Sequence, residues 1–172
     1  MTGVTTRLVA VADAPELAAV LTANREFLAP WDPVRGDDYY TAEGQRAHLE
    51  EVLRLWATGT ALPQVILDDG RIVGRVNLSN VVRGPFQSAN LGYWVAQDAN
   101  GRGVATAAVA RTARTAFDDL GLHRLEAGTL VHNLGSQRVL ERNGFQRYGL
   151  APRYLRIAGE WQDHILYQLL AD

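Results

Sequence analysis

Residues 100–106, with the sequence Asn-Gly-Arg-Gly-Val-Ala-Thr, contain the residue types that bind a phosphate group through the backbone. They lie between an apolar stretch at 91–95 and an alanine-rich stretch at 104–120, which indicates a loop joining a strand to a helix. Gly101 and Gly103 can adopt a positive φ and let backbone N–H groups approach a ligand closely. A helix N-terminus adds unpaired N–H groups and a partial positive charge. The pattern therefore predicts a backbone site for a phosphate or pyrophosphate.

Other interpretations of this loop differ in how well the residues fit them. Gly-x-Gly between a strand and a helix also forms simple tight turns that bind nothing, and this alternative stays open. A dinucleotide-binding fingerprint needs a third Gly or Ala where the chain has Thr106, so a nucleotide-binding dehydrogenase is a distant alternative. A Walker loop needs Gly-Lys-Ser/Thr, and the chain contains no lysine.

The chain lacks the residues that several other kinds of catalytic site require. The chain has no cysteine, which excludes disulfides, thiolate metal sites and a cysteine nucleophile. His123 and His164 have no partner at a metal-ligand spacing, so we expect no metal. No Gly-x-Ser-x-Gly motif is present for a serine hydrolase.

Length and composition indicate one globular domain over residues 1–172. The chain is 47% hydrophobic and 21% charged, which is ordinary for a protein that buries its own core. Its net charge is −2 and all 17 basic residues are arginine, so we expect no nucleic-acid partner. Without an apolar run of membrane-spanning length or a signal peptide, the sequence predicts a cytoplasmic protein that does not enter a membrane.

In the first third of the chain, helices are predicted around a proline-rich loop. A strand is expected at 6–11, followed by a helix through Thr22 that Asp13, with Glu16 three residues later, caps at its start. Residues 27–40 contain Pro30, Pro33 and Gly36 and are predicted to be a loop. Thr41 caps a second helix, whose apolar residues recur at helical spacing: Leu49, Val52, Leu53 and Trp56.

The remainder alternates strands with two further helices. Asp-Asp-Gly at 68–70 predicts a tight hairpin turn between strands at 65–67 and 71–76. Further strands are expected at 89–95, 124–130, 146–155 and 160–170, and further helices at 104–120 and 136–143, the latter ended by Gly144. The order β-α-α-β-β-β-α-β-α-β-β with hairpins predicts a mixed α/β sheet with helices on its faces.

This order of elements, with several short motifs, resembles the Gcn5-related N-acetyltransferase (GNAT) superfamily and, within it, the RimJ/RimL-type ribosomal-protein N-acetyltransferases. The superfamily's acyl-CoA loop, Gln/Arg-x-x-Gly-x-Gly/Ala, matches residues 100–105 with Asn100 at its first position. The other matching motifs are Thr6-Arg-Leu8, Pro30-Trp31, Leu91-Gly-Tyr-Trp-Val95, Asn133-Leu-Gly-Ser136, Glu141-Arg-Asn-Gly-Phe145 and Asp163-His164. The resemblance covers nearly the whole chain. It implies one GNAT-type domain of about seven strands and four helices, with the acyl-CoA loop between the fourth strand and the third main helix.

The resemblance also implies acetyl-CoA as co-substrate and a set of binding residues. The pyrophosphate would lie on the main chain of Gly101, Arg102, Gly103, Val104, Ala105 and Thr106. The strand ending at Val95 would pair with the pantetheine arm and offer an N–H group to the thioester oxygen. Asn133 would contact the pantetheine arm, and Arg138 a phosphate group of coenzyme A. Ser136 occupies the position of the residue that protonates the departing thiolate.

Some of these residues also fit plainer roles. Asn and Ser are favoured near helix starts, so Asn133 and Ser136 also fit capping positions. Arg102, Arg138 and Arg142 also fit solvated helix surfaces. The general base is open between Glu126, His132 and a water molecule. On the acceptor side, Asp32, Asp37 and Asp38 would attract a cationic N-terminus, or belong to an ordinary solvated loop.

The predicted activity is direct transfer of an acetyl group from acetyl-CoA to the N-terminal amine of a protein or peptide, without an acyl-enzyme. Two alternatives remain: a small amine as acceptor, or a non-catalytic CoA-binding module that acts as a sensor. Members of this branch often pair, so a homodimer is also expected.

Overall fold

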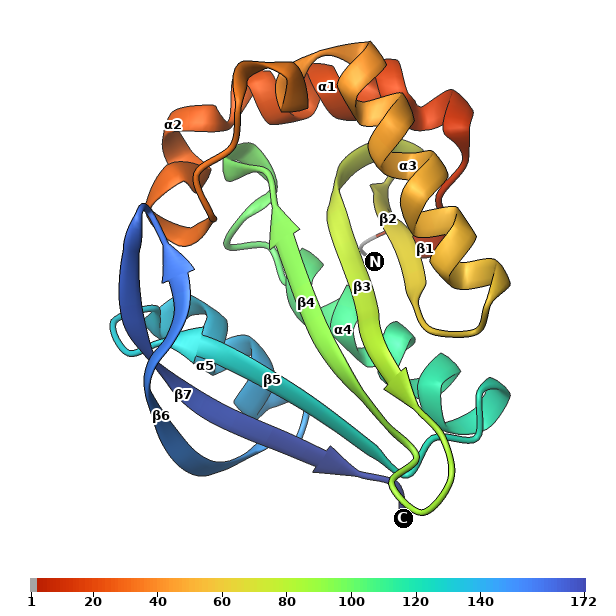
Figure 1. Ribbon diagram of the computed structural model, residues 1–172, viewed down its shortest axis with the longest axis vertical. Helices are drawn as coiled ribbons and strands as arrows, with labels where there is room; N and C mark the ends of the chain where they lie inside the picture. Colours follow the sequence, from red (N-terminus) through yellow and green to blue (C-terminus); the bar gives the residue numbers. More distant parts are fainter. Residues whose placement is uncertain (1–2) are drawn as a thin grey trace.

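Seven strands form one mixed sheet, in the order β1-β2-β3-β4-β5-β7-β6, in the computed structural model of residues 3–172 (Figure 1). The strands are β1 (Val4–Leu8), β2 (Leu62–Asp68), β3 (Arg71–Val82), β4 (Ser88–Val95), β5 (Arg124–Leu130), β6 (Gln146–Ile157) and β7 (Glu160–Leu170). The helices are α1 (Ala14–Ala23), α2 (Arg25–Leu28), α3 (Ala42–Ala57), α4 (Val104–Arg114) and α5 (Leu134–Arg142). The predicted mixed α/β class and the order of the main elements are confirmed. Residues 1 and 2 of the predicted domain 1–172 lie outside the described residues.

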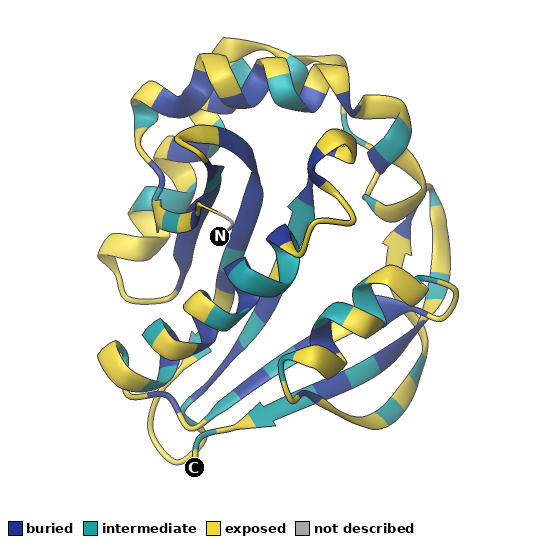
Figure 2. Cartoon of the chain, turned by 180° about the vertical axis from the view of Figure 1, so that it is seen from behind, coloured by how far each residue is buried: buried dark blue, intermediate teal, exposed yellow. Residues whose placement is uncertain are grey.

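Helices cover both faces of the sheet because adjacent strand residues point to opposite sides. On one face, Val65 of β2 packs in a cluster with Leu49 of α3 and residues of α1. On the other face, Ile66 belongs to a larger cluster with Val109 of α4 and Leu140 of α5. Figure 2 views the molecule from the α4 and α5 side and shows buried residues on the sides of these helices that face the sheet. Each helix therefore holds its own N-terminus in a fixed place against the strands.

The sheet opens between its two central strands. β4 and β5 run parallel, and they pair only at Ser88 with Arg124, Ala89 with Leu125 and Asn90 with Glu126. Beyond these residues the strands diverge (Figure 1), while β4 continues to pair with β3 as far as Val95. The edge of β4 that faces the opening therefore has no neighbouring strand over its second half, and such an edge can pair with an extended ligand.

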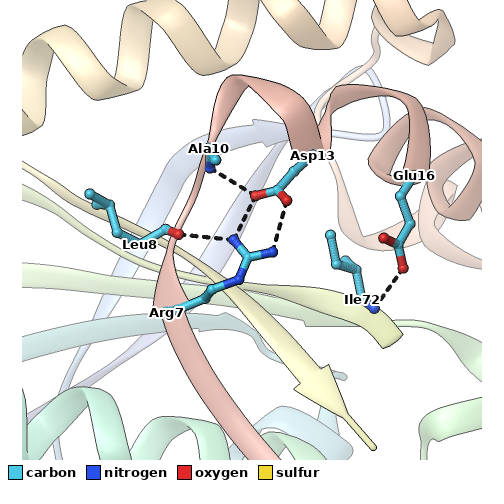
Figure 3. Close-up of polar contacts among 6 residues, drawn as sticks. All are labelled: Arg7, Leu8, Ala10, Asp13, Glu16 and Ile72. Atoms are coloured by element: carbon cyan, nitrogen blue, oxygen red, sulfur yellow. Dashed lines mark hydrogen bonds and ion pairs between the residues drawn. The ribbon is translucent and has the colours of Figure 1, made fainter. Parts of the chain in front are cut away.

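Polar contacts fix the N-terminal elements to the sheet (Figure 3). The Asp13 carboxylate accepts two hydrogen bonds from Arg7 and one from the Ala10 N–H, each 2.8 Å long. The Arg7 guanidinium holds the pKa of Asp13 below its usual value. Glu16 accepts a 2.9 Å hydrogen bond from the backbone N–H of Ile72 in β3.

These contacts correct the predicted capping of α1. The helix begins where expected, but Asp13 and Glu16 do not form a capping box for it. A single 3₁₀ turn, Val11–Asp13, precedes α1, so the Asp13 side chain points back to Arg7 and Ala10 instead of forward. Thr41, by contrast, does cap α3 and accepts a 3.0 Å hydrogen bond from the Gly44 N–H.

Two other segments differ from the sequence prediction. Residues 27–40, expected as a loop, contain the end of α2 and two 3₁₀ turns, Ala29–Trp31 and Asp37–Tyr40. Pro30 fits this arrangement because its fixed φ suits the first positions of a helical turn. The long helix expected at 104–120 ends at Arg114 and continues as a π-helical turn, Thr115–Asp119. The hairpin turn between β2 and β3 is confirmed, with positive φ at Asp69 and Gly70.

Candidate active site

The glycine loop ends at the N-terminus of α4 in the conformation that the sequence predicted. Gly101 and Gly103 have φ values of 77° and 79°, and Gly103 is the N-cap of α4. The Ala107 N–H donates to the Gly103 carbonyl at 2.9 Å, which leaves the N–H groups before it without helical partners. A Cβ added at either glycine would meet nothing within 4 Å, so the space above the loop is open. These features fit an anionic ligand that is bound by the backbone.

Asn100, which differs from the usual residue of the motif, anchors the loop. Its side-chain amide donates hydrogen bonds to the carbonyl oxygens of Val95 and Ala96, at 3.3 and 3.1 Å. The short amide therefore ties the loop to the end of β4.

Arg102 is the predicted site residue whose side chain lies elsewhere. Its Nη2 forms an ion pair with Asp68 Oδ2 of β2 at 2.8 Å, and it does not line the groove beside the loop. Only its backbone remains as a predicted contact to the pyrophosphate.

A groove of about 670 Å³ runs from the glycine loop to the N-terminus of α5. We call it the loop groove. It brings together the other predicted site residues: Val95, Gly101, Gly103, Val104, Ala105, Thr106, Asn133, Ser136 and Arg138. Arg138 and Arg142 are exposed and add two positive charges to its lining. The groove therefore combines backbone N–H groups with arginines, as a ligand with several phosphate groups requires.

Ser136 lies in a pair with a tyrosine that the sequence analysis did not identify. Its Oγ is 2.7 Å from the Oη of Tyr93 in β4. Burial raises the pKa of Tyr93 to about 12, so the phenol keeps its proton at neutral pH. In the sequence, Tyr93 lies within an apolar strand and is not distinguished from a core residue.

Asn133 is the N-cap of α5, as its residue type favours. Its side-chain oxygen accepts a 3.1 Å hydrogen bond from the Ser136 N–H. The amide NH₂ of Asn133 is the part of the side chain that is left for a ligand in the loop groove.

A second cavity, of about 480 Å³, lies at the same opening of the sheet, beside α3. We call it the α3 cavity. It is lined by residues of α3, of the segment 28–39 and of strands β3 to β7. It shares six lining residues with the loop groove, and the polar ones at the start of α5 and on β4 are among them: Leu28, Trp31, Tyr93, Trp94, Asn133 and Ser136. The two spaces therefore meet at the Tyr93–Ser136 pair.

Charged and titratable side chains line the α3 cavity. Arg75 of β3 donates from Nη1 to His48 Nε2 at 3.0 Å and from Nη2 to Asn77 Oδ1 at 2.9 Å. Burial, with the nearby positive charge of Arg75, lowers the pKa of His48 to about 4. Burial also raises the pKa of Asp32 above its usual value. Of these groups only Asp32 was a candidate from the sequence; Arg75 and His48 were not predicted, because they are far from it along the chain.

Only one of the three predicted acceptor-side carboxylates lies in the α3 cavity. Asp32 lines the α3 cavity, but Asp37 and Asp38 are exposed and do not. Asp37 instead forms an ion pair with Arg25 at 2.7 Å.

The two side chains considered as a general base, Glu126 and His132, lie in different places. Glu126 is paired with Arg124 at 2.8 Å and lines neither the loop groove nor the α3 cavity. His132 is exposed, lines the loop groove and packs against Trp31, with ring centroids 5.5 Å apart.

Two features are absent from residues 3–172: a cluster of metal ligands and a helix that could span a membrane. No three His, Cys, Asp or Glu side chains of this part of the chain gather as metal ligands would. Within the same residues, no helix combines the length and the apolar character needed to cross a membrane.

Comparison with known proteins agrees with this geometry. The family model described as "Acetyltransferase (GNAT) domain" matches residues 4–146. The probable N-acetyltransferase YjcK of Bacillus subtilis (strain 168) is 39% identical, with 93% of this chain and 90% of that protein covered. The [ribosomal protein uS5]-alanine N-acetyltransferase of Escherichia coli (strain K12) is 37% identical, with 95% and 85% covered.

A solved structure with bound coenzyme A is also similar. Mycobacterium smegmatis RimJ in complex with CoA-disulfide superposes with a TM-score of 0.94 at 36% identity, and the match covers 98% of this chain and 82% of that one. The chain therefore belongs to the GNAT acetyltransferase family and is an acetyl-CoA-dependent N-acetyltransferase.

Proposed function

We propose that this enzyme transfers the acetyl group directly to the N-terminal α-amine of a protein or peptide. The observation that carries the proposal is the meeting of the loop groove and the α3 cavity at Tyr93 and Ser136. One space suits acetyl-CoA, and the other reaches the same point with room for an amine. A relative 37% identical to this chain is named for acetylating the alanine of a ribosomal protein, which supports a protein acceptor. A ribosomal-protein acceptor would place the activity in the cytoplasm. We also infer that residues 1–172 form one domain.

For coenzyme A, we infer backbone contacts from the loop and polar contacts from α5. N–H groups of residues 101–106 would bind the pyrophosphate, and the open edge of β4 up to Val95 would pair with the pantetheine amides. The Asn133 amide would donate to the pantetheine arm. Arg138 is exposed, so we expect its contribution to phosphate binding to weaken in high salt.

For the chemistry, we infer that Ser136 supplies the proton that the departing sulfur takes up. Tyr93, which keeps its proton because its pKa is about 12, would donate it to the Ser136 Oγ at 2.7 Å in preference to the Ser136 carbonyl oxygen at 3.2 Å, and so orient the serine O–H toward the sulfur. An α-amine has a pKa near 8, so a substantial neutral fraction is available for attack at neutral pH. The chain has no cysteine to carry an acetyl group, which supports direct transfer.

A small amine is the alternative acceptor, because a cavity of about 480 Å³ is within the size range of small-ligand sites. A non-catalytic CoA-binding module is the other alternative. A homodimer stays a prediction, which light scattering of the purified protein would test.

The test measures thiol release and product mass with acetyl-CoA and a panel of acceptors. The panel contains short peptides with a free N-terminus, the same peptides with a blocked N-terminus, and small amines. We expect acetylation only of the free N-termini. Turnover of small amines alone would contradict the protein acceptor, and acetyl-CoA binding with no turnover on any acceptor would favour the non-catalytic alternative.

A further inference from the structure

A polar stripe runs along the inner strand β3 and faces the α3 cavity. Arg75, Asn77 and Ser79 all line the cavity, where Leu78 also contributes, whereas Val76 lies only in the core on the other face. β3 lies between β2 and β4 (Figure 1). Strands in this position usually bury apolar side chains, so the stripe points to a ligand rather than to packing.

Arg75 is deeply buried and has no anionic partner in the described structure. It is 4% exposed, and the acceptors of its hydrogen bonds, His48 and Asn77, are both neutral groups. Its Nε is buried and has no hydrogen-bond partner. Arg7 and Arg102, by contrast, each form an ion pair with a carboxylate at 2.8 Å. Burying a guanidinium without a counter-charge is unfavourable, which indicates that an anion completes this site.

The rest of the α3 cavity increases this excess of positive charge. Arg35 lines the cavity with its guanidinium 4.7 Å from the centre of the Tyr39 ring, and its Nε also has no partner. Among the described lining residues Asp32 is the carboxylate, so two guanidinium groups face one acid. His48, with a pKa near 4, is neutral at pH 7 and adds no charge.

This charge distribution has two consequences for an acceptor. An anionic group on it is attracted to the guanidinium groups. Its amine also loses its proton more easily near positive charge, and only the neutral amine can attack the thioester.

We propose that Arg75, together with Arg35, binds a carboxylate of the acceptor, so that the preferred acceptor is a peptide with Asp or Glu among its first few residues. The proposal rests on the proposed function. The short distance along the peptide follows from the size of the α3 cavity, about 480 Å³, since both Arg75 and Tyr93 line it. A carboxylate bound at Arg75 therefore lies close to the point where the two spaces meet.

The test is a double-mutant cycle between enzyme and peptide. Peptides with Glu at position 2, 3 or 4 are compared with the same peptides carrying Gln, using the wild type, Arg75→Met and Arg75→Lys. For at least one position we expect a preference for Glu of about tenfold or more in kcat/KM. Arg75→Met should abolish it through loss of activity on the Glu peptide, whereas Arg75→Lys should keep part of it.

Arg71→Met is the matched control, because Arg71 is exposed on the same strand and lines neither space. Acetyl-CoA affinity, measured by calorimetry, should be the same for all variants and shows that each has folded. Equal rates on Glu and Gln peptides with the wild type would overturn the inference, whether or not the variants fold. A preference for Glu that survives in Arg75→Met would also overturn it. Failure to acetylate any peptide would instead contradict the proposed function.

Discussion

The loop groove and the α3 cavity meet at the same two hydroxyl groups but are built in different ways. The loop groove takes the donors proposed to bind phosphate from the backbone of one continuous segment, 101–106, at the start of one helix. The α3 cavity takes its polar groups from side chains that are far apart in sequence, among them Asp32, His48 and Arg75. A backbone site tolerates changes of side chain, and Asn100 in the first position of the motif is one such change. A side-chain site is changed by single substitutions, so we expect the α3 cavity to set the acceptor specificity.

The largest effect should come from a negative charge in the loop groove. Gly103→Asp puts a carboxylate where phosphate groups bind and should weaken acetyl-CoA affinity by about 100-fold or more. Gly59→Asp is the matched control, because Gly59 also has a positive φ, of 75°, and open space around its Cβ, but lies outside the groove. Both variants carry similar backbone strain. Equal loss of affinity, measured by calorimetry, would show that strain and not the charge is responsible.

A smaller effect is expected where the two spaces meet. Ser136→Ala should lower kcat by about 100-fold, the lower range of general acid catalysis, with acetyl-CoA affinity unchanged. Tyr93→Phe should lower kcat by about tenfold, since it removes the hydroxyl that contacts both the Oγ and the carbonyl oxygen of Ser136 and keeps the ring.

The combined variant distinguishes a positioning role of Tyr93 from a structural one. If Tyr93 acts through Ser136, then Tyr93→Phe adds little to Ser136→Ala, because the tyrosine only orients a serine hydroxyl that Ser136→Ala has already removed. Tyr148→Phe, at an exposed position of β6, controls for loss of a tyrosine hydroxyl elsewhere. Fully multiplicative losses in kcat would contradict a positioning role of Tyr93 that acts through Ser136.

The smallest expected effect concerns how the stability of the folded chain depends on pH through His48 in the α3 cavity. The pKa of His48 is lowered from 6.5 to about 4 in the folded chain, so between these pH values the unfolded chain binds a proton that the folded chain does not. Stability is therefore full above pH 6.5 and is lost progressively as the pH falls toward 4. His48→Gln keeps an acceptor for Arg75 and should flatten this part of the profile in urea unfolding. An unchanged slope in His48→Gln would contradict the assignment.

The sequence predicted a mixed sheet, the order of the elements along the chain and the glycine loop because the signals for them are local. Strand and helix periodicity, the Asp-Asp-Gly turn and the two glycines each depend on neighbouring residues alone. Where a local signal fitted two different sets of hydrogen bonds, the prediction was wrong, as in the capping of α1. Asp13 and Glu16 have the spacing of a capping box, but Arg7 and the Ile72 N–H compete for their carboxylates.

The α3 cavity and the Tyr93–Ser136 pair were not predicted, since they depend on how the elements pack. Asp37 and Asp38 are close to Asp32 in sequence, yet the 3₁₀ turn that contains them leaves both exposed. The alternation at Arg75, Asn77 and Ser79 was the one available signal of a polar face on an inner strand. The general base also remains open, because neither Glu126 nor His132 lies in the α3 cavity.

The most direct test of a two-sided site is a crystal structure with a conjugate in which coenzyme A is linked through its sulfur and an acetyl bridge to the N-terminus of a Glu-containing peptide. The account predicts the pyrophosphate on the N–H groups of residues 101–106, the sulfur beside the Ser136 hydroxyl, and the peptide in the α3 cavity with its carboxylate on Arg75. A sulfur distant from Ser136, or a peptide that leaves the site without entering the α3 cavity, would contradict it.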